Sequence, residues 1–372
     1  MNAKRSATTI RLQLSDQLKD FVRGGWRRSS AISGLIALTA LFEVAGDASF
    51  AILHADPVGW RSEWRQTDFS KHSVPFAEIK SGGPAKDGIP SIDTPRFEQL
   101  DHGKPIGWSA GLVGVEPVIA LSIDRDARAY PLRVLIWHEI ANDTVGRVPV
   151  TVTYCPLCNA ALVFERVIDG RVLDFGTTGK LRNSDLVMYD RQTESWWQQF
   201  TGEAIAGAMT GRHLRLIPSR LESFDRFRHR FPRGQVLVPS NPNARNYGRN
   251  PYVGYDSTGQ KPFLYDGSLP EGIEPMERVV AVEVVPGRHE AWALALLRRS
   301  GAIESADLLL QWQPGQTSAL DKATISAGRD VGNVIVQKRQ GDELVDVPYD
   351  VTFAFVFHAF RPNSPIYNNA SD

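Results

Sequence analysis

The fold is decided by the stretch Val148-Pro-Val-Thr-Val-Thr-Tyr154, followed by Cys155-Pro-Leu-Cys158, Asn159-Ala-Ala-Leu-Val-Phe-Glu-Arg-Val-Ile168 and Asp169-Gly170. β-Branched and aromatic residues alternate over 148–154, which is typical of a strand. The two cysteines then lie on a tight turn, and residues 162–168 predict a second strand. An Asp-Gly pair favours a two-residue hairpin turn, after which residues 171–175 return. The stretch therefore predicts antiparallel β structure with both thiols on one turn.

The sequence on both sides of this stretch predicts further short strands and a few helices. The fold class that we expect is α+β with predominantly antiparallel β structure. Strands are predicted at residues 118–123, 186–189, 195–200 and 235–239. Helices are predicted at residues 132–140, which carry Trp137 and His138, and at 223–231, where phenylalanines recur at helical spacing.

Two segments in the first half of the chain are echoed in the second half. Glu116-Pro-Val-Ile-Ala-Leu resembles Glu277-Arg-Val-Val-Ala-Val, and Ser223-Phe-Asp-Arg-Phe resembles Thr352-Phe-Ala-Phe-Val. The echoes predict two related β-rich units, of which the second is shorter, degenerate and without a counterpart of the cysteine segment. Chance similarity between strand patterns is the alternative.

The predicted organisation of the chain has five parts. They are an N-terminal signal peptide or anchor at 1–51, an extended turn-rich lead-in at 52–115, a first β-rich unit with the Cys/His site at 116–240, a long connecting loop at 241–275 and a second, degenerate unit at 276–372. A connection as long as 241–275 is more often functional than idle.

The N-terminal segment has the pattern of an export signal. Seven basic residues precede the uncharged run Ile32 to Phe42, which is shorter than the ~20 residues of a membrane-spanning helix but suits a signal-peptide core. Ser49-Phe50-Ala51 is a candidate cleavage site. We therefore expect an exported protein, periplasmic or extracellular. The alternative is an amphipathic N-terminal helix that stays on the protein or anchors it at the membrane surface.

Composition excludes several classes of function. Of 372 residues, 42 are basic and 42 acidic, which argues against a general nucleic-acid-binding surface. Two cysteines are too few for a disulfide scaffold. The Gly-rich segment 176–182 lacks the Gly-Lys-Thr/Ser ending of a phosphate-binding loop, so no nucleotide cofactor is expected.

The pair Cys155 and Cys158 is the centre of the predicted chemistry. Two cysteines at this spacing form a redox disulfide, half of a metal site, or a nucleophile with a bystander. His138 is the leading candidate for a third ligand, because the strand 148–154 leads back toward its segment. Two thiolates and an imidazole suit copper(I) or zinc. Glu139 or Asp143 could orient the imidazole, and a buried structural histidine is the alternative.

A second polar cluster follows the Gly-rich segment. Asn183 and Asp185 could line a pocket or accept hydrogen bonds from the metal-ligating side chains, and Asp185 could act as a base. The alternative is that Asn, Ser and Asp serve only the chemistry of a turn.

These residues resemble a known bacterial family, the domain of unknown function numbered 3179. The shared runs are Tyr130-Pro-Leu-Arg-Val-Leu-Ile-Trp-His-Glu-Ile-Ala-Asn-Asp, Thr153-Tyr-Cys-Pro-Leu-Cys and Leu181-Arg-Asn-Ser-Asp-Leu-Val-Met-Tyr-Asp-Arg-Gln-Thr. The resemblance covers about residues 85–360 and implies an exported or membrane-anchored protein. It also implies that His138 and Cys155 recur while the position of Cys158 varies. It implies no activity.

Three hypotheses remain, and the sequence leaves open whether the chain is an enzyme. The first is a copper or zinc site with a binding or redox role, held by Cys155, Cys158 and His138. The second is a cysteine-dependent enzyme in which His138 activates Cys155. The third is a non-catalytic module with a Cys155–Cys158 disulfide and a partner on loop 241–275. The partner or substrate would be a small molecule, a metal or a protein.

Overall fold

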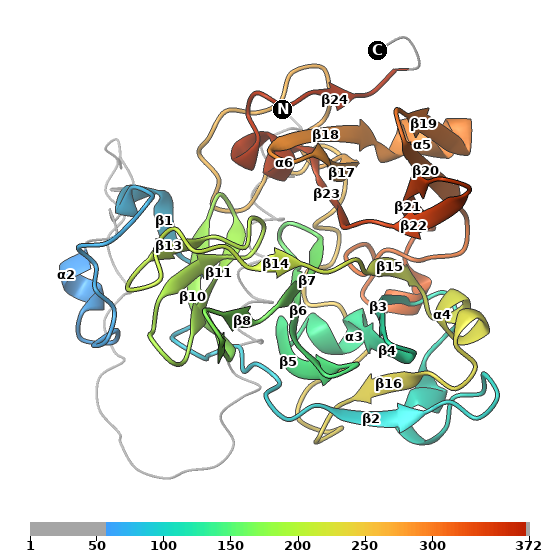
Figure 1. Cartoon of the computed structure of the whole chain (residues 1–372), viewed down its shortest axis with the longest axis horizontal. Coiled ribbons are helices and arrows are strands. Elements are labelled where there is room, and N and C mark those ends of the chain that lie inside the picture. The colour runs from blue at the N-terminus through green and yellow to red at the C-terminus, as the bar shows by residue number, and fades with distance from the viewer. Residues whose placement is uncertain (1–56, 370–372) are drawn as a thin grey trace, which may run out of the picture.

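The structure is a computed structural model that describes residues 57–369. Over these residues the fold consists mainly of antiparallel β sheets with short helices between them (Figure 1). The predicted signal peptide or anchor at 1–51 lies outside the described residues. Within 57–369, no helix is long and apolar enough to cross a bilayer.

A four-stranded sheet in the middle of the molecule carries the cysteines. Its strand order is β14 (Arg215–Leu216), β7 (Ala160–Glu165), β6 (Val148–Cys155) and β5 (Ile140–Val145). Every pair in it is antiparallel, and Cys155 pairs with Ala160 across the β6–β7 turn. The short hairpin of β8 (Val167–Ile168) and β9 (Arg171–Val172) follows, with Asp169 and Gly170 at positive φ. The predicted strand–turn–strand and Asp-Gly hairpin are confirmed.

A five-stranded sheet lies beside it and carries a second hairpin, β10–β11 (Figure 1). Its order is β1 (Ile79–Ser81), β10 (Phe175–Arg182), β11 (Asp185–Asp190), β12 (Trp196–Gln198) and β13 (Ala204–Ala206). Trp196 and Trp197 are both fully buried, but in different hydrophobic clusters. Both tryptophans therefore belong to the core.

Two other sheets share one pattern of strand pairing. The first has the order β15 (Arg220–Ser223), β3 (Pro117–Ile123), β4 (Asp126–Pro131), β16 (Gln235–Val238) and β2 (Arg96–Gln99). The other has the order β23 (Tyr349–Phe353), β17 (Arg278–Val285), β18 (Arg288–Ala293) and β24 (Ile366–Tyr367). In each, an antiparallel hairpin pairs on one side with an antiparallel strand and on the other with a parallel one.

The likeness extends to the helices and their hydrogen bonds. Helix α4 (Phe224–Arg230) follows β15, and α6 (Ala354–Phe360) follows β23. Phe224 N donates to Glu116 O at 2.8 Å, and Ala354 N donates to Glu277 O at 2.8 Å. These bonds make Phe353 the structural equivalent of Ser223, whereas the sequence echo aligns Ser223 with Thr352, one residue earlier. Descent of the two units from a common ancestor, with a degenerate second copy, stays a prediction.

The remaining elements complete the C-terminal half and the connections. A last sheet has the order β19 (Ala302–Ser305), β20 (Leu308–Gln313), β21 (Asn333–Gln340) and β22 (Glu343–Asp346). The other helices are α2 (Pro57–Trp60), α3 (Leu132–Leu135) and α5 (Leu294–Ser300), with 3₁₀ turns at Phe76–Glu78, Gly107–Gly111 and Ile325–Ala327. The helix predicted over 132–140 is therefore shorter than expected. It ends before Trp137 and His138, because Glu139 has a φ of 58° and β5 begins at Ile140.

The long loop 241–275 is fastened through one buried carboxylate, Asp256. Its Oδ2 accepts from Arg278 Nη2 at 2.9 Å, Arg329 Nη2 at 2.8 Å and Ser318 Oγ at 2.5 Å. Burial alone would raise the pKa of Asp256, but the two guanidinium groups hold it below its ordinary value. The loop is thus held to the first residue of β17 and to two residues between β20 and β21.

Replacing Asp256 with asparagine should destabilise the protein strongly. Arg278 is only 6% exposed, so the substitution leaves a buried guanidinium without its counter-charge. The expected loss is about 3–5 kcal/mol in the free energy of unfolding, measured by urea denaturation.

The matched control is Asp169→Asn, which breaks the exposed Asp169–Arg212 pair and should cost less than about 1 kcal/mol. Equal losses for the two variants would show that Asp256 does not anchor the loop.

Candidate functional site

The two cysteines lie at the ends of a four-residue turn between β6 and β7. Cys158 N donates to Cys155 O at 3.2 Å, and Asn159 N donates to Pro156 O at 3.3 Å. Asn159 has a φ of 53°, a conformation that asparagine tolerates better than most residues. The turn directs both side chains into the protein, where Cys155 is 2% exposed and Cys158 is fully buried. Both cysteines are free thiols.

The strand β23 holds this turn from the far side. Thr352 Oγ1 donates to Cys158 O at 2.8 Å, and Phe353 N donates to the same oxygen at 3.3 Å. Asn159 Nδ2 donates in return to Val351 O at 2.6 Å. The position of the thiols therefore depends on a strand that lies almost two hundred residues later in the chain.

Asp185 enters the site from the tight hairpin between β10 and β11. Asn183 and Ser184 have φ values of 52° and 67°, and Arg182 pairs with Asp185, as in a two-residue hairpin with a type I′ turn. The thiol of Cys155 contacts Ser184 O at 3.9 Å. The turn interpretation of this segment is therefore confirmed for its backbone. The binding function predicted for the Asn183 side chain stays a prediction.

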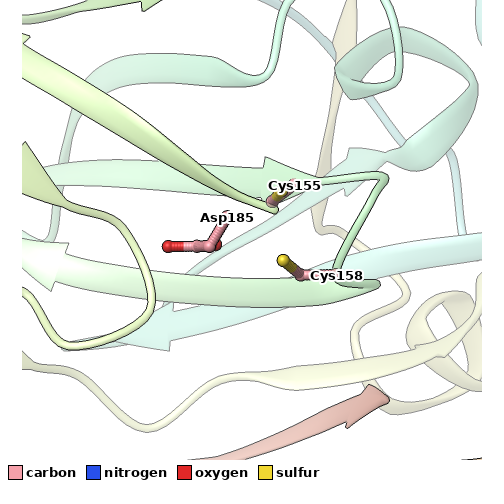
Figure 2. A group of neighbouring side chains, drawn as sticks. All are labelled: Cys155, Cys158 and Asp185. Atoms are coloured by element: carbon pink, nitrogen blue, oxygen red, sulfur yellow. The ribbon is translucent and has the colours of Figure 1, made fainter. Parts of the chain in front are cut away.

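Cys155, Cys158 and Asp185 form one compact group of potential metal ligands (Figure 2). One oxygen of Asp185 and both sulfurs lie within 4.8 Å of one another, and all three residues are buried. Asp185 Oδ2 accepts from Gln198 Nε2 at 2.6 Å and from Phe200 N at 2.9 Å. Asp185 Oδ1 has no hydrogen-bond partner among residues 57–369. Oδ2 is thus fixed by Gln198 and Phe200, and the carboxylate lies within reach of both thiols.

Burial shifts every acidic group at this site toward its neutral form. It raises the pKa of Cys155, and that of Cys158 well above its ordinary value. It also raises the pKa of Asp185 to about 6, in spite of the hydrogen bonds from Gln198, from Phe200 and from the two thiols. Without a cation the thiols therefore stay protonated, and a bound metal ion would supply the charge that ionises them.

Glu139 is a further buried acid near this group. Burial raises its pKa to about 8, with a smaller contribution from the charge of Asp185. Glu139 has a positive φ in the segment between α3 and β5. Its carboxyl, and not the imidazole of His138, interacts electrostatically with Asp185 and Cys155. The carboxyl forms no hydrogen bond and no ion pair with residues 57–369.

His138 lies in a separate network. Pro90 O can only accept, so Nδ1 donates to it at 2.8 Å, and Nε2 then accepts from Tyr247 OH at 2.8 Å. Burial lowers the pKa of the imidazole, which favours this neutral form. Within 57–369, the metal-ligand group around the cysteines does not contain His138. Both of its nitrogens are engaged, and its pairing with Cys155 stays a prediction.

The residues that were expected to orient His138 do something else. Asp143 accepts from Arg128 Nη1 at 2.7 Å and from Tyr130 OH at 2.6 Å. Glu139 lies near Asp185 instead. The orienting partner is the Pro90 carbonyl, from a segment 48 positions away. A backbone carbonyl has no side-chain signature, so no sequence pattern could have identified it.

Comparison with known proteins places the chain in one family. The sequence profile of the family described as "Protein of unknown function (DUF3179)" matches residues 86–364, which is most of the chain. The chain belongs to this family. Its matched region contains the cysteine turn, Asp185 and Glu139, so the whole site lies in the part that defines the family. No curated protein and no solved structure matches the chain significantly.

Asp350 is a buried acid of the site's surroundings that the sequence did not single out. Its Oδ1 accepts from Ala161 N at 3.0 Å and from Val351 N at 2.9 Å, while Oδ2 has no partner among the described residues. Burial raises its pKa to about 7, although the two N–H groups lower it. The Asp350 carboxyl thus links β23 to β7 by a hydrogen bond, and its raised pKa favours the protonated form.

Asp350→Asn should stabilise the protein at alkaline pH. Because the pKa of Asp350 is raised on folding, wild-type stability from this group is complete below about pH 4 and is lost as pH rises toward 7. The amide carries no charge and keeps Oδ1. The variant's advantage in unfolding free energy should therefore grow over this range to about 4 kcal/mol and then level off.

The measurement is urea denaturation of both proteins from about pH 4 to pH 8. Glu304→Asn, at an exposed position of β19, serves as a control that should show no such growth. A constant difference across the range would mean that Asp350 ionises freely in the folded protein.

Proposed function

We propose that this chain binds one soft or borderline metal ion, zinc or copper(I), through Cys155, Cys158 and Asp185. The single observation that supports the proposal is the compact buried group of two thiols and a carboxylate whose Oδ1 lacks a partner. In this ligand set Asp185 takes the place predicted for His138.

The ligand types favour zinc over copper(I). Zinc accepts thiolate sulfur together with carboxylate oxygen, whereas copper(I) prefers sulfur and imidazole nitrogen. Replacing an expected imidazole by a carboxylate therefore shifts the preference toward zinc. Magnesium and calcium are poor candidates, because two of the three ligands are sulfur.

Proton balance also supports a metal ion over a free cysteine nucleophile. A nucleophile must be a thiolate, and burial raises the pKa of Cys155. Binding of a divalent ion releases one proton from each thiol and leaves two thiolates on the metal. Three protein ligands leave a fourth position of a tetrahedral ion for an exchangeable ligand, as in catalytic and transport sites.

Reconstitution should load about one metal ion per chain. Protein purified without oxygen is stripped, incubated with zinc, copper(I) or cobalt(II), and analysed for metal content. Cobalt should give thiolate charge-transfer absorption that zinc abolishes. Cys155→Ser, Cys158→Ser and Asp185→Asn should each weaken zinc binding by about 100-fold, because each removes one share of a large binding free energy.

Asp174→Asn is the matched control, since Asp174 is partly exposed and pairs with Arg166. It should bind zinc like the wild type. Metal content below about a tenth of an equivalent after reconstitution would exclude the proposal.

His138→Gln separates the two candidate ligand sets. Its nitrogens already bond to Pro90 and Tyr247, so the variant should keep zinc affinity within about twofold of the wild type. The readout is competition with a coloured zinc chelator. A loss as large as that of Cys155→Ser would restore His138 as a ligand and argue against Asp185.

A further inference from the structure

A pocket opens beside the cysteine turn and has an unusual lining. Its volume, with its open mouth included, is about 630 Å³. The walls come from the lead-in, the β10–β11 hairpin and the loop 241–275, and most lining residues are apolar. They include Ile89, Leu157, Leu181, Leu186, Tyr252 and Phe263. Leu157 lies between the two cysteines and Leu186 follows Asp185, so the pocket adjoins the proposed metal site.

Glu139 is the acid in this apolar lining. Its side chain borders the pocket, the residue is only 7% exposed, and its carboxyl has no polar partner among residues 57–369. A buried carboxyl without a partner is costly, and such groups are normally paired. The structure therefore lacks the group that would satisfy it.

The charge around Glu139 indicates the sign of that missing group. Its acidic neighbours are Asp185 and Cys155. Lys180 also lines the pocket, but its charge is paired with Glu63 at 3.7 Å. A bound anion would disfavour ionisation of these acids still further, whereas a bound ammonium group would favour the ionised form of Glu139 and lie beside the aromatic residues Tyr252 and Phe263.

We propose that this pocket binds a small apolar molecule that carries one protonated amine, with the ammonium group on Glu139 and the apolar body against the aromatic and aliphatic walls. The proposal goes beyond the metal site and does not require a metal to be bound. A bound ammonium supplies the counter-charge for the ionised carboxylate, so that binding below about pH 8 releases the Glu139 proton to solvent.

Three probes of one size but different charge test the proposal. Benzylamine, benzyl alcohol and benzoate are titrated into the full-length, metal-free protein by calorimetry. We expect benzylamine to bind with 1:1 stoichiometry, benzyl alcohol about 10- to 100-fold more weakly, and benzoate not at all, since a charge-assisted hydrogen bond is what separates them.

Variants assign the binding to Glu139. Glu139→Gln should lower benzylamine affinity to that of benzyl alcohol, while Glu304→Gln, at an exposed position of β19, should leave it unchanged. Phe263→Ala removes one apolar wall and keeps the Glu139 carboxyl, so it should weaken the binding of both benzylamine and benzyl alcohol. It keeps the test open if Glu139→Gln does not fold.

The outcome is separable from that of the proposed metal site. Cys155→Ser should lose metal affinity and keep benzylamine binding. Benzoate binding as tight as benzylamine, unchanged benzylamine affinity in Glu139→Gln, or no binding of benzylamine to the wild type would each overturn the inference.

Discussion

The clamp between the cysteine turn and β23 is the constraint on which the site depends. A four-residue turn is not rigid in isolation, and its buried backbone groups need partners. The Cys158 carbonyl receives two donors from β23, and Asn159 returns one hydrogen bond to the same strand. Thr352 and Cys158 are 194 positions apart. The thiols therefore take their positions only when the C-terminal half has folded against β7.

The protein treats its buried acids in two different ways. Asp256 is fully buried, and two arginines and a serine surround it and lower its pKa. Asp185 and Glu139 are equally enclosed, but no arginine or lysine pairs with them within 57–369, and burial raises both pKa values. The chain thus neutralises the buried carboxylate that anchors the loop, whereas Asp350, which ties β23 to β7, has only backbone donors and a raised pKa. Unpaired acids at one place are typical of functional sites, where a ligand completes the charge balance.

The sequence predicted the parts of the site that depend on neighbouring residues. The cysteine turn, the Asp-Gly hairpin and the turn before Asp185 each follow from local patterns of two to eight residues. The sequence could not show how His138 and Glu139 are oriented, and the pairing of His138 with Cys155 stays a prediction. Adjacent residues in an irregular segment face different ways, and the positive φ of Glu139 decides which of them approaches Asp185. Contacts from Pro90, Asp350 and Tyr247 come from distant segments, and no local pattern encodes them.

The connection between β20 and β21 shows what the C-terminal half contributes. In the central sheet the strands β6 and β7 are joined by a tight turn that carries the thiols, whereas β20 and β21 are joined by residues 314–332. That longer connection supplies Ser318 and Arg329 to the carboxylate of Asp256.

Asp256 follows Tyr255, whose hydroxyl donates to Leu157 O at 3.1 Å inside the cysteine turn. Tyr252, three positions earlier, lines the pocket. The C-terminal half therefore holds the site from two sides, because β23 fixes the turn itself and residues 314–332 fix the loop that forms a wall over it.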